Sequence, residues 1–287
     1  MFYLRCSHRR LRHLAAVLSL AVAPLSILGQ TSNCKAAHPE YKTAEARAAL
    51  DEGVGAFKGA QYEKAIADFQ NAANLDPCLP NAKLYLGTAL AQNVVPGLES
   101  PENLAIAQRA IDALRDVLAE DPHDVNSMKQ LASVYFNIRK LEDAKEWQKQ
   151  VLGEDPDDPE AAYTVGVIDW SLAHQNVLAR LNPIGLNDDG EGNVKAPAQV
   201  LNNIRSENSA LVQEAIEYLN RAIEKRPGYG NAMAYLNLVY RRKADLDWEN
   251  PAAREDDVAK ANEWSKKAMD ARKANEIRIH SQVSDKQ

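Results

Sequence analysis

A short motif recurs four times along this chain, each time ending five residues before a proline. Each copy has a small residue, a second residue four positions later, and a small or β-branched residue three positions after that. Spacings of four and three share one face of an α-helix, and a proline ends a helix. The motif therefore predicts four similar helices. Its copies are Ala65, Phe69 and Ala72 before Pro77, Ala110, Leu114 and Val117 before Pro122, Ala144, Gln148 and Val151 before Pro156, and Ala215, Leu219 and Ala222 before Pro227.

A second motif alternates with the first and predicts a second type of helix. The segments NAKLYLG at 81–87 and NAMAYLN at 231–237 align directly, and 46–53, 125–132 and 159–166 match them. The last residue of each segment is mostly small, as a close crossing between two helices requires. These residues are Gly53, Gly87, Ala132, Gly166 and Asn237.

The distances between the prolines indicate where residues have been inserted. Pro122 and Pro156 are 34 residues apart, whereas the intervals before and after them are 45 and 71 residues. The extra residues are expected between the two helices of a pair. In the first insertion, Ser100 before a proline predicts an N-cap and a helix to about residue 119. The second insertion, 173–209, is expected to be a loop followed by helix from about Ala196.

The two alternating helices in a unit of 34 residues resemble the tetratricopeptide repeat. The best copy, 46–77, departs from the family pattern at Ala49 and Ala56 and matches it at Gly53, Tyr62, Ala65, Phe69, Ala72 and Pro77. The resemblance covers about 41–273. It implies an all-α, right-handed α-solenoid of about five helix-turn-helix repeats with insertions, at about 46–79, 80–124, 125–158, 159–229 and 230–273, followed by a polar tail at 274–287.

The composition agrees with helices packed through small side chains. The chain has 45 alanines but only 13 glycines and 13 prolines, and 45% of its residues are hydrophobic. A β-sandwich or barrel needs more turn and β-branched residues, and a disordered chain has fewer hydrophobic ones.

The N-terminus has the pattern of an export signal. Residues 1–13 are basic, and the apolar run 14–29 is short for a membrane span, which needs about 20 residues. We expect a signal peptide at 1–29, a flexible leader at 30–40, and a mature protein in the periplasm or cell envelope, or secreted. Three alternatives stay open. One is an uncleaved anchor, which would be the only route to membrane association. The others are a twin-arginine signal at Arg9 and Arg10 and lipidation of Cys34.

The sequence contains no motif that supports catalysis, a metal or a cofactor. The stretch Asn187–Asn193 has calcium-type ligands at some positions of an EF-hand loop, but Ala198 stands where the bidentate glutamate is needed. The histidines outside residues 1–29 have no ligand spacing. Without residues 1–29, 30 basic side chains face 40 acidic ones, which disfavours nucleic acid as a partner. We therefore expect a protein that is not an enzyme and has no cofactor.

By resemblance, the first helix of each repeat lines a concave groove that binds a protein or peptide. The family register predicts these partner-binding residues: Asn126, Lys129, Phe136, Asn137, Tyr163, Trp170, Asn231, Arg241 and Arg242. The register also places Asn81, Leu84, Thr88, Ser133, Val167 and Leu238 there. Alternatively, the three aromatic residues pack beneath the insertions. The carboxylate-clamp variety of the family is disfavoured by Leu50, Leu84 and Ser133 at its other positions.

The function expected from these features is that of an exported interaction scaffold. The alternative is an enzyme or ligand carrier that uses a pocket under the 173–209 insertion. We also predict a disulfide between Cys34 and Cys78, because the start of the first helix and the end of the second lie at the same end of an antiparallel pair. In the other interpretation, Cys34 is a free thiol in a disordered leader.

Overall fold

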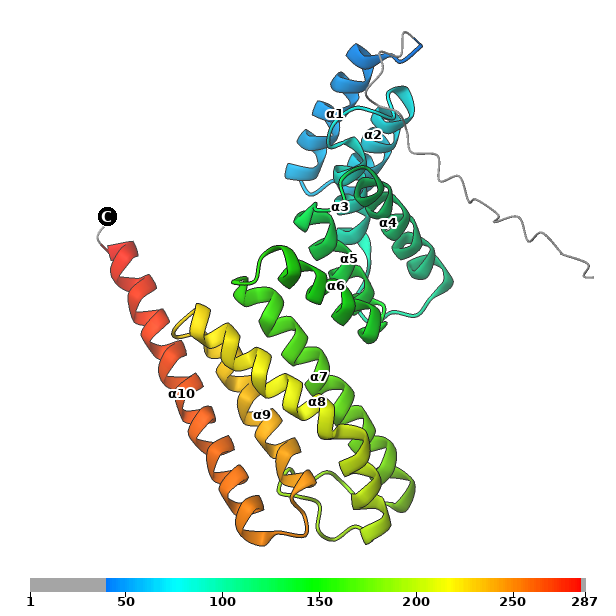
Figure 1. Ribbon diagram of the computed structural model, residues 1–287. Helices are drawn as coiled ribbons and strands as arrows, with labels where there is room; N and C mark the ends of the chain where they lie inside the picture. Colours follow the sequence, from blue (N-terminus) through cyan, green and yellow to red (C-terminus); the bar gives the residue numbers. More distant parts are fainter. Residues whose placement is uncertain (1–39, 285–287) are drawn as a thin grey trace, which may run out of the picture. The chain divides into compact units, whose positions relative to one another are not determined.

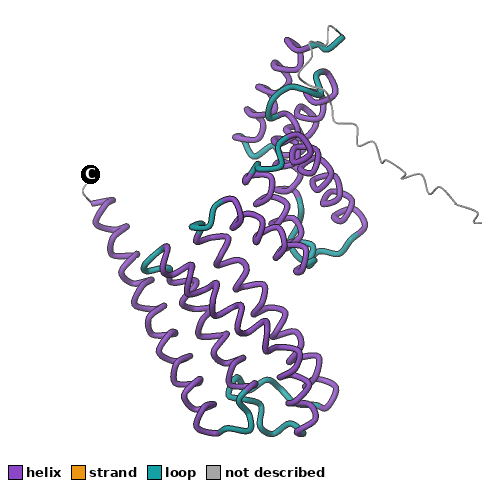
Figure 2. The backbone as a smooth tube through the Cα atoms, in the orientation of Figure 1, coloured by secondary structure: helices purple, strands orange, loops and turns teal. Residues whose placement is uncertain are grey.

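The computed structural model describes residues 40–284, which form α-helices joined by turns and loops (Figures 1 and 2). No strand occurs in this part of the chain, so the all-α prediction is confirmed. None of its helices is long and apolar enough to cross a membrane. The predicted signal peptide and most of the predicted leader lie outside the described residues.

The helices pack as consecutive pairs, and each pair also packs against the next. This arrangement confirms the predicted α-solenoid of helix-turn-helix units. The pairs are α1 (Thr43–Lys58) with α2 (Tyr62–Leu75), α3 (Ala82–Asn93) with α4 (Pro101–Glu120), α5 (Val125–Asn137) with α6 (Leu141–Glu154), α7 (Pro159–Leu181) with α8 (Ala198–Lys225), and α9 (Gly230–Leu246) with α10 (Pro251–Ser284).

The two sequence motifs meet where the helices of a pair cross. In three pairs, the glycine of the first helix faces the large central residue of the motif on the second helix. A Cβ atom added to Gly53 would lie 2.6 Å from Phe69. The corresponding distances are 2.7 Å from Gly87 to Leu114 and 2.5 Å from Gly166 to Leu219. Each glycine therefore makes room for a buried side chain, and the two motifs form two sides of one contact.

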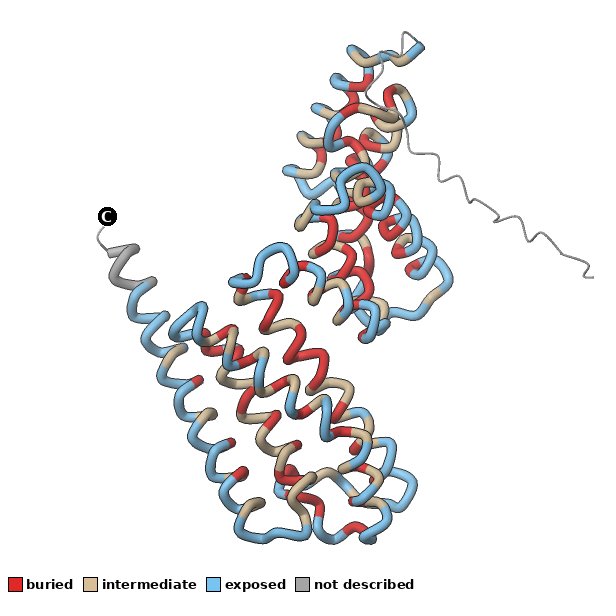
Figure 3. Tube along the Cα trace, in the orientation of Figure 1, coloured by how far each residue is buried: buried red, intermediate tan, exposed pale blue. Residues whose placement is uncertain are grey.

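Buried residues recur along the helices of every pair from one pair to the next (Figure 3). One apolar cluster extends from α1 to α7, and a second extends from α5 to α10. Capping side chains fix several helix starts, because an N-cap oxygen bonds a backbone N–H that has no partner within the helix. The predicted cap at Ser100 is present and accepts from the N–H of Asn103 at 3.2 Å.

The second insertion is mostly helical, which corrects the expectation of a loop from residue 173. α7 continues to Leu181 and α8 begins at Ala198, so only 182–197 is not α-helical, with a short 3-10 turn at Asn182–Ile184. The extended parts of α7 and α8 bury apolar residues against each other, including Val177 and Ile204. The insertion thus lengthens the fourth helix pair. α10 also continues as helix through residues 274–284, within the predicted polar tail.

Cys78 lies just beyond the end of α2, as expected for the predicted bridge. It is disulfide-bonded. Cys34 lies outside the described residues, so the pairing of Cys34 with Cys78 stays a prediction.

Candidate functional site

An apolar pocket of about 320 Å³ is lined by the first helices of the first three pairs and by Phe69 of α2. We call it the α1–α5 pocket. The groove register had placed three of its residues there, namely Leu84, Thr88 and Asn126. Val54, Phe57 and Lys58 were not singled out, although they occupy the same register positions in the first repeat. The pocket is lined by Val54, Phe57, Lys58, Phe69, Leu84, Tyr85, Thr88, Asn126 and Gln130.

Aromatic rings held by neighbouring helices form part of the pocket wall. The Phe69 ring is buried against Gly53, and its centroid lies 5.6 Å from that of Tyr85. Tyr85 is 36% exposed, so part of its ring stays open to an incoming group. Phe57 contacts Tyr62 in an edge-on arrangement at 5.4 Å. The pocket is therefore held by packed rings yet accessible from outside.

Amides and a positive charge lie around the apolar wall, and no carboxylate lines the pocket. Asn126 and Gln130 are one turn apart on α5, where their amides can bond an extended backbone. Neither α3 nor α5 contains an aspartate or glutamate, although the whole chain has a net charge of −6. Lys58 is therefore the one charged side chain in the pocket lining, which favours an occupant with negative charge.

Lys129 contacts Asp158, the N-cap residue of α7, and this contact ties the third repeat to the fourth. Burial acts to raise the pKa of Asp158, but hydrogen bonds from Lys129 and from backbone N–H groups at the start of α7 lower it overall. The Lys129 side chain is 43% exposed. The Lys129 ammonium group therefore stabilises the N-terminus of α7, while part of the side chain stays exposed to solvent.

Phe136 and Asn137 lie beside the first insertion and line a second pocket of about 290 Å³. The carbonyl of Asn137 accepts a hydrogen bond from the N–H of Gly97 at 2.8 Å. Phe136 is 37% exposed. The first insertion therefore borders the predicted groove residues of the third repeat and leaves the phenylalanine ring accessible.

Tyr163 and Trp170 belong to an aromatic cluster shared by α7 and α9. Tyr163 lies 5.7 Å from Tyr235, Trp170 lies 5.3 Å from the same ring, and Trp170 stacks on His174 at 5.2 Å. Burial raises the pKa of Tyr163 to about 12. These half-buried rings join the fourth and fifth repeats, and Trp170 also reaches the segment between α7 and α8.

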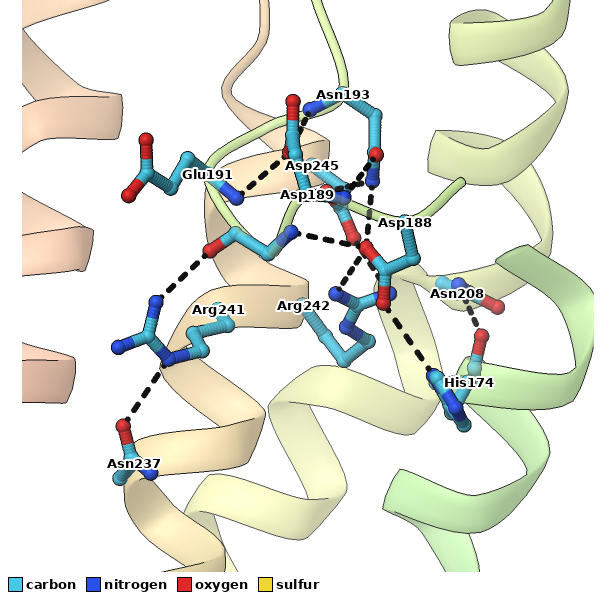
Figure 4. A network of polar contacts seen from close by, with 12 residues as sticks. His174, Asp188, Asp189, Glu191, Asn193, Asn208, Asn237, Arg241, Arg242 and Asp245 are labelled. Atoms are coloured by element: carbon cyan, nitrogen blue, oxygen red, sulfur yellow. Dashed lines mark hydrogen bonds and ion pairs between the residues drawn. The ribbon is translucent and has the colours of Figure 1, made fainter. Parts of the chain in front are cut away.

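That segment and α9 enclose a third pocket of about 300 Å³, which we call the loop pocket. Arg241 lines it and bonds Asn237 and the carbonyl of Gly190 (Figure 4). It also donates a hydrogen bond to Asn262. The loop pocket is lined by Trp170, His174, Asp188, Asp189, Gly190, Leu238, Arg241 and Arg242.

Arg242 does not lie in an open groove, and its part in partner binding stays a prediction. Its side chain is only 3% exposed, because it lies beneath the loop between α7 and α8. One guanidinium nitrogen lies 2.8 Å from Asp188 and another lies 3.2 Å from Asp245. Asn231, by contrast, is exposed at the start of α9 and lines none of the three pockets.

Comparison with known proteins identifies the repeat and the fold. A family model for the tetratricopeptide repeat matches residues 107–166, from α4 into α7. The chain is similar to the solved structure of MamA from Desulfovibrio magneticus, with 16% identity, a TM-score of 0.53, and coverage of 80% of this chain and 96% of that one. It is also similar to YrrB, which is described as a TPR protein with an unusual peptide-binding site, with 15% identity, a TM-score of 0.51, and coverage of 84% and 94%. At these identities the likeness concerns the fold alone. No curated protein matches the chain.

Proposed function

Since this chain is a tetratricopeptide-repeat protein, we propose that it is a non-enzymatic scaffold that binds a segment of a partner protein along its first helices. The α1–α5 pocket is the anchor site. The observation that carries this proposal is an accessible apolar wall with amides at its edge and no carboxylate in its lining. Peptide binding by YrrB, a protein of similar fold, agrees with this use of the array.

The chemistry of the pocket specifies the partner segment further. A volume of about 320 Å³ accommodates one large apolar side chain, which the rings of Phe57 and Tyr85 contact. Asn126 and Gln130 hydrogen-bond the backbone on either side of this anchor. Lys58 favours carboxylates nearby, so the segment is extended, acidic overall and anchored by one apolar residue.

The proposed place of action is the cell envelope, because the basic and apolar N-terminal pattern is typical of an export signal. The partner is then another envelope or secreted protein. Sequencing the N-terminus of the protein recovered from the envelope fraction tests export. A start between about residues 30 and 35 is expected, and an intact Met1 contradicts cleavage.

A ligand carrier is the second candidate function, because a pocket does exist beneath the second insertion. However, the guanidinium groups of Arg241 and Arg242 in that pocket already bond the protein's own groups. The α1–α5 pocket has no such internal occupant, and this difference favours the scaffold.

Two exposed asparagines at equivalent positions of their repeats provide a matched test. Asn126→Trp is expected to cover the α1–α5 pocket and weaken partner capture at least tenfold in a pull-down from envelope extract. Asn231→Trp adds the same side chain at the start of α9, away from the three pockets, and is expected to leave capture unchanged. Equal capture by both variants, with unchanged melting temperatures, contradicts the proposal.

A further inference from the structure

The segment that connects α7 to α8 is bound to a helix of the following repeat. We call its residues 187–193, with the sequence NDDGEGN, the acidic loop. The close view shows it lying against α9 (Figure 4). Asp188 accepts a hydrogen bond from Arg242 at 2.8 Å, Asn193 donates to Asp245 at 2.8 Å, and the Gly190 carbonyl accepts from Arg241 at 3.3 Å. The fourth repeat is thereby tied to the fifth.

The α9 residues beneath the acidic loop are ones that the family register assigns to the groove. Leu238, Arg241 and Arg242 occupy three such positions of the fifth repeat, and Trp170 occupies one of the fourth. The loop has three carboxylates and no basic residue, and it lies on two arginines. The negative charge of this segment is therefore complementary to the positive charge of the two arginines that it covers.

The acidic loop has the conformation of a preformed turn. Oδ1 of Asp189 accepts from the N–H groups of Glu191 and Asn193 at 2.8 and 2.9 Å, which fixes the backbone between them. Gly192 has a φ of +104°, and a Cβ atom there would lie 3.1 Å from the carbonyl oxygen of Ala244. Only glycine permits this close approach to α9.

The contact leaves two buried polar atoms without a hydrogen bond. They are Nη1 of Arg242 and Oδ2 of Asp245, on side chains that are 3% and 0% exposed. The two atoms lie 3.2 Å apart, without the alignment that a hydrogen bond requires. A competing segment that offers a carboxylate to Nη1 of Arg242 and an N–H group to Oδ2 of Asp245 gains interactions that the acidic loop does not make.

We propose that the acidic loop is an intramolecular ligand that occupies a binding subsite of the groove in the fifth repeat. This subsite, which we call the station, is lined by Leu238, Arg241 and Arg242. A partner turn with carboxylates binds this station by displacing the loop. A partner that displaces the loop presupposes the proposed scaffold function, so this proposal rests on it. The α1–α5 pocket, however, takes no part in the test below. The two proposals therefore fail separately.

The test supplies the loop as a separate molecule. Residues 186–195 are replaced by a glycine-serine linker of equal length, and the probe is a fluorescein-labelled peptide of residues 185–197. By fluorescence anisotropy, the linker chain is expected to bind the peptide at least tenfold more tightly than the intact chain, in which the station is occupied. A peptide carrying Asp188→Asn and Asp189→Asn is the charge control and is expected to lose this binding. Both chains also carry Asn126→Trp, which covers the α1–α5 pocket, so that the comparison reports binding at the fifth repeat alone.

A folded linker chain that binds the peptide no better than the intact chain overturns the proposal. Hydrogen exchange on the intact chain decides the question if the linker chain loses its helical circular dichroism. Saturating peptide is then expected to speed amide exchange in residues 187–193 at least tenfold without changing exchange in α7 and α9. Unchanged exchange in the loop means that it is a fixed part of the fold, and the proposal is wrong.

Discussion

The close contact between Gly87 and Leu114 determines whether a substitution at Gly87 stabilises or destabilises the protein. Replacing a glycine in a helix by alanine usually stabilises the helix by about 0.5–1 kcal/mol. At Gly87, however, the new Cβ would lie 2.7 Å from Cγ of Leu114 and 2.8 Å from Cδ2. Leu114 is fully buried, so it has little space to move. Overpacking of this kind costs about 1–3 kcal/mol, and Gly87→Ala is expected to lower the free energy of unfolding by about 1–2 kcal/mol.

The same substitution is expected to stabilise a chain that already carries Leu114→Ala. The two close atoms are then absent, and the nearest remaining neighbour is the Leu114 backbone nitrogen, at 3.5 Å, an ordinary contact. Gly87→Ala should raise the free energy of unfolding in this background by about 0.5–1 kcal/mol. The double-mutant cycle therefore predicts a coupling of about 2 kcal/mol.

Urea denaturation followed by circular dichroism measures the four corners of this cycle. Gly55→Ala in α1 is the matched control, because beyond its chain neighbours and the adjacent backbone of its own helix nothing lies within 4 Å of its added Cβ. It is expected to stabilise the chain in either background. If Gly87→Ala stabilises both backgrounds equally, the close crossing is absent and the explanation of the glycine motif is wrong.

Further predictions concern charge, pH and the cysteines. Lys129→Glu is expected to lower the melting temperature measured by circular dichroism, because it places a second carboxylate beside the N-cap of α7; an unchanged value contradicts this role. Burial raises the carboxyl pKa of Asp169 and of Asp245 to about 7. The stability that these two carboxyl groups contribute is expected to be lost as the pH rises from about 4 through 7. Asp169→Asn should therefore reduce the difference between the free energies of unfolding that urea denaturation gives at pH 5 and at pH 8. Mass spectrometry of the unreduced protein is expected to show a Cys34–Cys78 bridge, whereas two free thiols exclude it.

The helix pairs were predictable because their signals are local in sequence. Gly87 and Leu114 each belong to a motif that repeats, so one pair explains the others. The family register also brought Leu84, Thr88 and Asn126 together, because residues at equivalent positions of adjacent first helices lie side by side. Applied to the first repeat, the same register indicates Val54, Phe57 and Lys58, whereas Tyr85 and Gln130 occupy no register position.

The burial of Arg242 could not be predicted from the sequence motifs around it. Its burial depends on Asp188, which is 54 positions earlier in a segment without repeat periodicity. The helical ends of the second insertion did carry a signal, since Ala173, Val177 and Leu181 recur at helical spacing and are all buried. The family pattern has no counterpart for this insertion, and the loop expectation followed from its polar centre.

Site-specific cross-linking tests the central claim about the α1–α5 pocket most directly. A photoreactive amino acid is placed at Gln130, which lines the pocket, or at Asn231, which does not. The account predicts cross-linking from position 130 alone, to one acidic partner segment with a large apolar residue at or next to the linked site. Equal cross-linking from position 231, or a basic segment captured at position 130, would contradict it.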